Sequence, residues 1–191
     1  MSRARQLLLV LLAGVGFGVV AAVIKGQDTG ARDVLGNLIA PWVVVPFLAG
    51  SRYASVWRAT LVGVAATLAA LLGFYVAEAA ILDLGSHPWY TDLQLTLRAG
   101  RFWATWGLLS GAVYGALGGV WASRRNAAAA VAVGLAFVGE PLITTFTSRA
   151  GLWAGGALFH YSWIWVSEVL IGLGCIAFVV AQTRGRIVSR G

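Results

Sequence analysis

Six runs of mostly apolar residues, separated by shorter polar segments, make up most of the chain. A helix that crosses about 30 Å of hydrocarbon needs about 20 residues at a rise of about 1.5 Å each. Each run is close to that length and therefore predicts a transmembrane helix. The expected bounds are 7–24, 35–50, 59–81, 100–122, 127–146 and 162–182. The pattern predicts an all-α integral membrane protein, one bundle of six helices that occupies residues 1–191.

Two features modify this pattern. The second run is short and contains Pro41 and Pro46, and proline removes a helical hydrogen bond, so we expect this helix to be tilted or broken. The longest connections, 82–99 and 147–161, contain Trp89, Trp153, His87 and His160. We expect these connections to fold over the helix ends as lids.

Charge is distributed unevenly between the two sides of the predicted bundle. One side carries nine arginines and no acidic residue: Arg3, Arg5, Arg52, Arg58, Arg124, Arg125, Arg184, Arg186 and Arg190. The other side carries five cations, Lys25, Arg32, Arg98, Arg101 and Arg149, and all seven acids, Asp28, Asp33, Glu78, Asp83, Asp92, Glu140 and Glu168. Arginine-rich loops remain in the cytoplasm, which predicts cytoplasmic N and C termini. The single lysine, with abundant Ala, Gly and Val, favours a bacterial plasma membrane protein.

Composition excludes several classes of function. Hydrophobic residues make up 59% of the chain, charged residues 11%, and the mean hydropathy is +0.81, so lipid is the expected solvent. The formal charge of +7 would indicate nucleic acid in a soluble protein, but these cations lie between apolar runs, so no nucleic-acid partner is expected. One cysteine and two distant histidines predict no disulfide and no metal site. Nucleotide-binding glycine motifs are absent from the sequence, so we expect no cofactor.

A four-residue pattern, aromatic-valine-small-glutamate, occurs three times. It reads Tyr75-Val76-Ala77-Glu78, Phe137-Val138-Gly139-Glu140 and Trp165-Val166-Ser167-Glu168. Residues three apart share a helix face, so each glutamate has a ring one turn away. An intramembrane carboxyl usually faces the bundle interior, pairs with a cation or stays protonated. We therefore expect Glu78, Glu140 and Glu168 to point into one cavity as acid and base, the alternative being purely structural hydrogen bonds or ion pairs.

Aromatic residues share the acidic side. Seven of nine tryptophans are expected there: Trp42, Trp89, Trp103, Trp106, Trp153, Trp163 and Trp165. A stripe of Trp103, Trp106, Ser110 and Tyr114, beside Phe102, follows helical spacing. This predicts either a cavity wall or a lipid-facing aromatic belt. The full set expected to bind substrate is Trp42, Tyr75, Phe102, Trp103, Trp106, Ser110, Tyr114, Phe137, Tyr161 and Trp165.

The small size, the multiple helices and the Glu/Trp/Tyr content resemble the bacterial membrane-bound terpene cyclases of the drimentine type, which cyclise farnesylated indoles. The resemblance implies a metal-independent isomerase with a lipophilic substrate that enters from the bilayer. A glutamic acid would protonate an alkene, and rings would stabilise the carbocation.

Two other functions stay open. Size and topology are also similar to the substrate-binding subunits of energy-coupling-factor vitamin transporters, in which case the Gly14, Gly18 and Ala22 face would dock a partner. A Glu/Trp site could equally bind an organic cation for transport. A scaffolding membrane protein is the third possibility, although three embedded glutamates would destabilise it without benefit.

Overall fold

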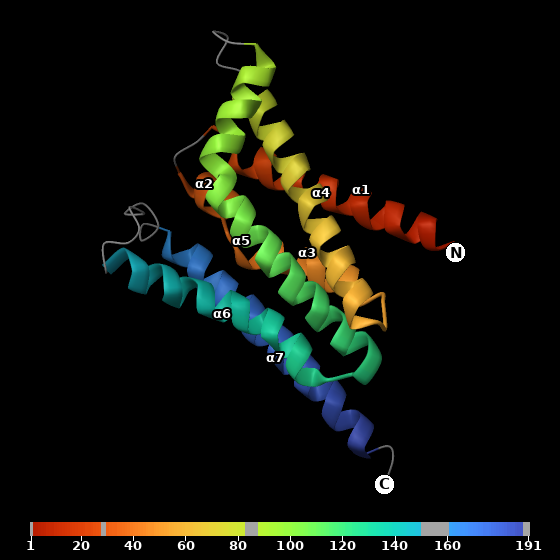
Figure 1. The fold of residues 1–191 in the computed structure, drawn as a ribbon. Helices are drawn as coiled ribbons and strands as arrows, with labels where there is room; N and C mark the ends of the chain where they lie inside the picture. The colour runs from red at the N-terminus through yellow and green to blue at the C-terminus, as the bar shows by residue number, and fades with distance from the viewer. Residues whose placement is uncertain (1, 28–29, 83–87, 150–160, 189–191) are drawn as a thin grey trace.

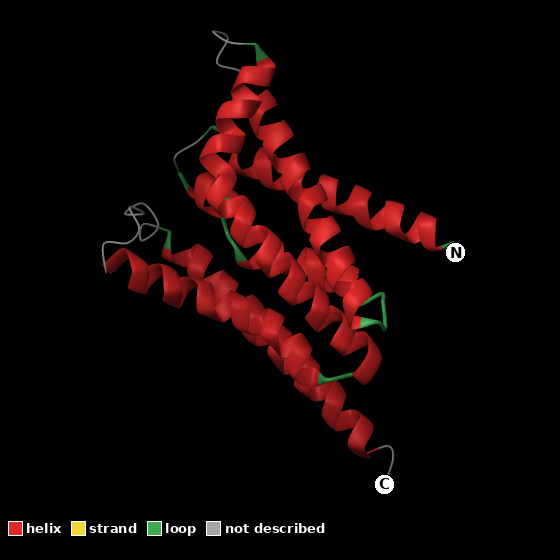
Figure 2. Cartoon of the chain, in the orientation of Figure 1, coloured by secondary structure: helices red, strands yellow, loops and turns green. Residues whose placement is uncertain are grey.

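The computed structural model describes residues 2–27, 30–82, 88–149 and 161–188. All regular secondary structure in these ranges is helical (Figures 1 and 2). The helices are α1 (Arg3–Lys25), α2 (Ala31–Gly36), α3 (Ala40–Gly50), α4 (Val56–Leu82), α5 (Trp89–Arg124), α6 (Ala127–Arg149) and α7 (Ser162–Val188). The predicted all-α class is confirmed.

Five segments are long and apolar enough to cross a membrane. They are Ala4–Lys25, Ala31–Gly50, Val56–Ile81, Ala127–Phe146 and Ser162–Thr183. The 36-residue helix α5 is the longest of all, about 54 Å at the helical rise, but its first half carries Asp92, Arg98 and Arg101 and is less apolar. The structure therefore has five or six helical segments suited to a bilayer, as expected of a multi-pass membrane protein.

Most predicted bounds shift by a few residues, and two segments differ more. The second run is broken, as its prolines led us to expect, but the break lies at residues 37–39, before Pro41, whereas Pro46 is inside α3. Residues 89–99, predicted to be part of a lid, form the first three turns of α5. That part of the lid prediction is wrong. The other lid residues, His87, Trp153 and His160, lie outside the described residues.

The long helices alternate in direction (Figure 1). The starts of α4 and α6 and the ends of α3, α5 and α7 lie toward one end of the bundle, at the lower right of the view, and the start of α1 lies at the right. We call this the arginine-rich end, because Arg52, Arg58, Arg124 and Arg125 lie there. Helices α6 and α7 form a hairpin along one side; α6 contacts α3 and α5, and α7 packs chiefly on α6.

Glycine allows α1 and α4 to come into backbone contact. A Cβ added at Gly14 would lie 2.7 Å from the Ala66 carbonyl oxygen, and one at Gly18 only 1.9 Å from that of Ala70. The reverse holds at Gly73 of α4, where an added Cβ would meet the Val15 carbonyl oxygen at 2.3 Å. The small-residue face of α1, considered as a docking surface for a partner protein, is therefore covered by α4 of the same chain.

Replacing Gly18 by Leu should strongly destabilise the bundle. The new side chain would overlap the α4 backbone, which cannot move aside as a flexible side chain can, so we expect a loss of about 3 kcal/mol or more. Gly16 on the same helix is the matched control, because a Cβ there meets nothing within 4 Å. The thermal midpoint in detergent should fall for Gly18→Leu and stay near wild type for Gly16→Leu. Equal midpoints would show that the close α1–α4 contact is not formed.

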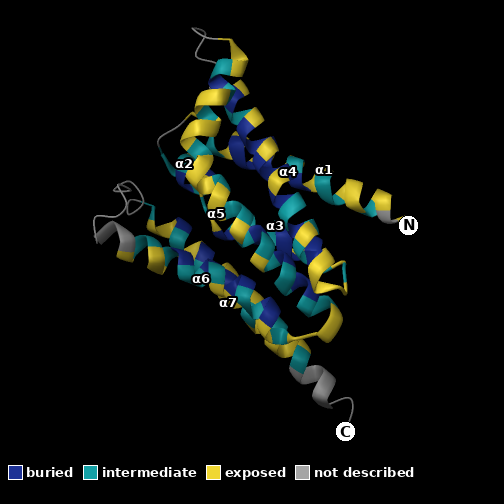
Figure 3. Ribbon diagram, viewed as in Figure 1, coloured by how far each residue is buried: buried dark blue, intermediate teal, exposed yellow. Residues whose placement is uncertain are grey.

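The buried apolar side chains form two clusters. One joins α3 to α6 through Ala40, Val43, Phe47, Ala130, Val133 and Phe137. The other joins α1 to α4 through Ala21, Ala22, Leu71, Phe74 and Tyr75. Outward positions on α1, α6 and α7 are exposed and largely apolar (Figure 3). Exposing leucine and phenylalanine side chains to water is unfavourable, whereas lipid acyl chains solvate them.

Candidate carboxyl site

The Glu140 side chain of α6 binds the first backbone N–H groups of α3. The Ile39 amide donates to Glu140 Oε1 at 2.6 Å, and the Ala40 amide donates to Oε2. Ala40 is the first residue of α3, and Glu140 is only 8% exposed. The first N–H groups of a helix have no partner within it and carry the positive end of its dipole. Both effects favour a carboxylate at this place.

The break before α3 has local causes. The Asn37 amide N–H bonds back to the carbonyls of Asp33 and Val34, and its side-chain nitrogen donates to the Asp33 carboxylate at 2.9 Å. These bonds end α2. Pro41 then lies in the first turn of α3, where its missing N–H is no loss. The sequence therefore places a free helix start inside an otherwise apolar segment.

Glu168 of α7 is the second carboxyl at this site. It is 2% exposed and lies close enough to Glu140 for the two carboxyl groups to interact. Neither Oε1 nor Oε2 of Glu168 has a hydrogen-bond partner within the described part of the chain. Helices α6 and α7 thus bring two carboxyls together at the start of α3, and only Glu140 of the two accepts backbone N–H groups there.

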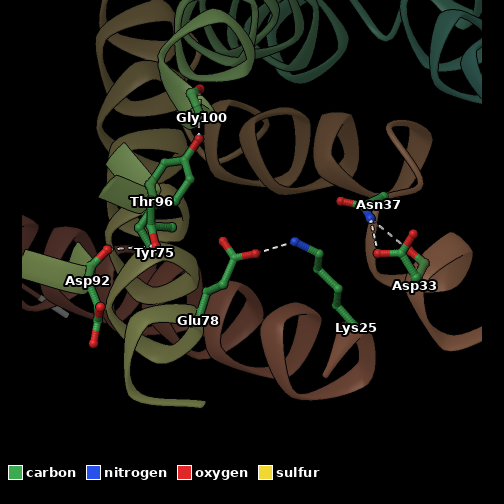
Figure 4. A network of polar contacts seen from close by, with 8 residues as sticks. All are labelled: Lys25, Asp33, Asn37, Tyr75, Glu78, Asp92, Thr96 and Gly100. Carbon is green, nitrogen blue, oxygen red and sulfur yellow. Dashed lines mark hydrogen bonds and ion pairs between the residues drawn. The ribbon is translucent and has the colours of Figure 1, made fainter. Parts of the chain in front are cut away.

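Glu78, the third predicted acid, is bound elsewhere. Its Oε1 accepts from Lys25 Nζ at the end of α1 (Figure 4). The Lys25 ammonium also lies 5.6 Å from the ring centroid of Phe74. The sequence pattern did not indicate that Lys25 is the cation that pairs with Glu78. Its place in the last turn of α1, where a helix C-terminus favours a cation, was an available signal.

Breaking the Lys25–Glu78 pair should cost stability. The two side chains are 23% and 12% exposed, so each charge is partly desolvated. We expect Lys25→Met to lose about 1 to 3 kcal/mol, because it leaves Glu78 unpaired. The Lys25→Met/Glu78→Gln double variant should recover part of the loss, measured as a thermal midpoint in detergent. Strictly additive effects of the two changes would show that the side chains do not interact.

Four of the predicted substrate-binding aromatic residues turn inward. Tyr75 is buried, and its hydroxyl donates to the Gly100 carbonyl at 2.9 Å (Figure 4). Phe137 is buried in the α3–α6 cluster, and Tyr114 packs against it. The Trp42 ring makes edge contacts with those of Phe17 and Phe74, at centroid distances of 5.2 and 5.5 Å. These rings fill the interior by packing on one another.

Three others face outward. Phe102, Trp103 and Trp106 are 59%, 41% and 56% exposed, and the Phe102 ring contacts both tryptophans edge-on. Of the two alternatives for this stripe, the structure favours the lipid-facing belt. Ser110 is half-buried and donates to the Gly107 carbonyl of its own helix. Tyr161 and Trp165, at the start of α7, are half-buried.

The structure thus brings together two of the three glutamates. Glu140 and Glu168 meet, whereas Glu78 pairs with Lys25. One hollow among the described residues lies between α1 and α4, and another lies along α7 beside Trp165. Neither is lined by an acid. Among the described residues, the Glu78 carboxylate is thus bound to Lys25, and neither of these hollows joins it to the Glu140–Glu168 pair.

Asp92 is another buried acid, 3% exposed, in the first turns of α5. Its carboxyl oxygens have no hydrogen-bond partner among the described residues. The nearby Thr96 hydroxyl donates to the Asp92 backbone carbonyl, at 2.9 Å (Figure 4). The positive end of the α5 dipole favours a negative charge at this position. No group of three or more potential metal ligands occurs within the described ranges.

Comparison with known proteins places the chain at family level. No curated protein and no solved structure matches it. Residues 1–190 match the model of a family of unknown function, DUF6518. Because this match covers nearly the whole sequence, the chain belongs to the DUF6518 family.

Proposed function

We propose that this protein is a membrane carrier in which the Glu140–Glu168 pair exchanges a proton for an organic cation. The proposed topology has six spans, with α5 as the span that is less apolar than the other five. The arginine-rich end lies in the cytoplasm, because arginine-rich loops are retained there. The carboxyl pair then lies in the outer half of the bilayer.

The observation that carries the proposal is the unequal bonding of the two carboxyls. Like charges in contact repel strongly where water is excluded, so two adjacent buried carboxyls hold one proton between them. Glu140 accepts two backbone N–H groups at a helix start, which suit its charged form. Glu168 has no such bonds and no cation partner among the described side chains. The shared proton therefore belongs on Glu168.

An organic cation suits this pair as the exchanged ligand. When a cation binds beside Glu168, the proton leaves and the carboxylate neutralises the new positive charge, so total charge at the site is conserved. Phe137 and Trp165 lie one helical turn from the two glutamates, the spacing at which an aromatic side chain shares a helix face with a carboxyl that binds a cation. Broken helices with charged groups at the exposed helix start recur in transporters, where they form the substrate and ion site.

A second candidate is protonation-initiated cyclisation of a prenylated substrate, as the resemblance to terpene cyclases implies. One observation favours it: a buried acid without hydrogen-bond partners, next to a carboxylate that can take up a proton. Such an acid can protonate an alkene. Among the described residues, Phe137 and Trp165 lie one turn from the two glutamates, whereas Phe102, Trp103 and Trp106 face outward and supply no wall.

Proton release on ligand binding tests the carrier proposal. Purified protein in weakly buffered detergent solution is titrated with the monovalent cations ethidium or tetraphenylphosphonium, and the pH is recorded with an indicator dye. About one proton should leave per bound cation, and protons that leave an acidic vesicle lumen should drive uptake of the same cations into proteoliposomes. In parallel, a panel of prenylated indoles is incubated with membranes and analysed by chromatography and mass spectrometry. If a product isomer of unchanged mass forms and no cation causes proton release, the carrier proposal is wrong and the cyclase is favoured.

A further inference from the structure

A hollow at the arginine-rich end is separate from the carboxyl site. It lies where α1 diverges from α4, toward the N-terminus (Figure 1). Ala4, Leu7, Tyr53, Arg58, Leu61 and Val62 line it, and its volume is about 290 Å³. The close contacts at Gly14 and Gly18 hold the two helices together only farther along α1. The divergence leaves an apolar wedge that is open to the bilayer.

Arg58 gives this wedge a charge at its edge. Its side chain is exposed and makes no ion pair with any described residue. Arg5 follows Ala4 on α1, and Arg52 lies in the turn before α4; both are also exposed. The sequence places no acid at this end. An arginine guanidinium binds phosphate oxygens in pairs. Because no acid balances these arginines, a lipid of net negative charge is favoured over a zwitterion, whose ammonium group they repel.

Aromatic side chains place the wedge at the membrane surface. Trp57, 70% exposed, precedes Arg58, and Tyr53 lines the hollow itself. Tryptophan and tyrosine typically lie at the level of lipid headgroups. The apolar walls therefore face acyl chains, while Arg58 is level with the phosphates.

We propose that the wedge between α1 and α4 binds an anionic phospholipid of the surrounding bilayer. One acyl chain lies against Leu7, Leu61 and Val62, and the phosphate is bound by Arg58. The bound lipid fills the space that the diverging α1 leaves open and ties its first turns to α4. This site requires no part of the carrier proposal.

Native mass spectrometry of the purified chain tests this site. The protein is mixed with phosphatidylglycerol or phosphatidylcholine of identical acyl chains, and retained lipid is counted. Phosphatidylglycerol should be retained preferentially, and Arg58→Gln should weaken its binding about fivefold, the ratio that corresponds to about 1 kcal/mol for one arginine. Arg124→Gln is the matched control, since it removes the same charge at the same end of the bundle but not from the hollow.

Two results would overturn the site. Equal weakening by Arg58→Gln and Arg124→Gln would show general attraction to a basic surface, and equal retention of the two lipids would show that the headgroup is not recognised. Leu61→Trp provides an independent test, because it fills the apolar wall without changing charge. It should displace phosphatidylglycerol while the thermal midpoint stays near wild type, and undiminished lipid binding in this variant would place the lipid elsewhere.

Discussion

Replacing Glu168 by Gln should reduce proton release on cation binding from about one proton per site to none. Glutamine has the shape of the neutral acid but no proton to give up. Proton-driven uptake of ethidium into proteoliposomes should fall to the level of empty vesicles. The thermal midpoint should change little, because one neutral group replaces another and neither Glu168 oxygen has a hydrogen-bond partner in the described structure.

Glu78→Gln is the matched control for this prediction. It makes the same chemical change on another membrane-embedded glutamate, one that is paired with Lys25. It should lower stability but leave proton release on cation binding intact. Proton release by Glu168→Gln equal to that of wild type would remove Glu168 from the mechanism, and loss of release in Glu78→Gln alone would move the proton site to the Lys25–Glu78 pair.

Glu140→Ala should produce the largest stability loss among the acidic positions. It leaves the Ile39 and Ala40 amides without their acceptor at a buried helix start. Losing a capping acceptor costs about 0.5 to 2 kcal/mol, and leaving buried donors unsatisfied adds to that cost, so we expect about 2 to 4 kcal/mol. The thermal midpoint in detergent should fall, and amide hydrogen exchange should accelerate in peptides that cover residues 37–45.

Leu142→Ala serves as the control on the same helix. Leu142 is 68% exposed, two residues from Glu140, and its truncation removes side-chain volume without touching α3. It should leave exchange in residues 37–45 at the wild-type rate. If Glu140→Ala also leaves this exchange unchanged, Glu140 does not cap α3, and the two carboxyls must be arranged differently.

Both predictions concern one physical arrangement, in which the hairpin of α6 and α7 is tied to the rest of the bundle at the start of α3. The hairpin also packs on α3 through Phe137 and Val133. Cation binding at Glu168 would act directly beside the Glu140–α3 bonds. A change of charge at the Glu140–Glu168 pair therefore acts directly on the contact between the α6–α7 hairpin and α3.

The helical class and the approximate positions of the apolar helices followed from local sequence alone. A run of about 20 apolar residues must satisfy its own backbone hydrogen bonds in lipid, and only a helix does so within one segment. Pro41 and Pro46 marked the second apolar run as one that could be broken, whereas the position of the break at residues 37–39 depends on the Asn37 bonds that end α2. The start of α5 was missed because Asp92, Arg98 and Arg101 interrupt its apolar pattern, whereas the helix is held there by contacts such as Tyr75 with Gly100.

The aromatic-valine-small-glutamate pattern identified three embedded acids but not their partners. Spacing along a helix determines which side chains share a face, and gives no information on which other helix that face meets. The Glu140 bonds join residues about one hundred positions apart in the sequence. The same limit applies to Trp103 and Trp106, whose stripe was evident from spacing but whose outward direction depends on where α3 and α4 pack on α5.

The sequence by itself determined that this chain is helical, suited to a membrane, and polarised between an arginine-rich end and an acid-rich end. These properties depend on composition and on residues within one or two turns of each other. Only the tertiary structure decided that Lys25 pairs with Glu78, that Glu140 caps α3, and that Glu168 lies beside Glu140 without a bond of its own. The reason is physical: an embedded carboxyl must find a donor, a cation or a proton, and which of these it finds depends on the helix packed against it.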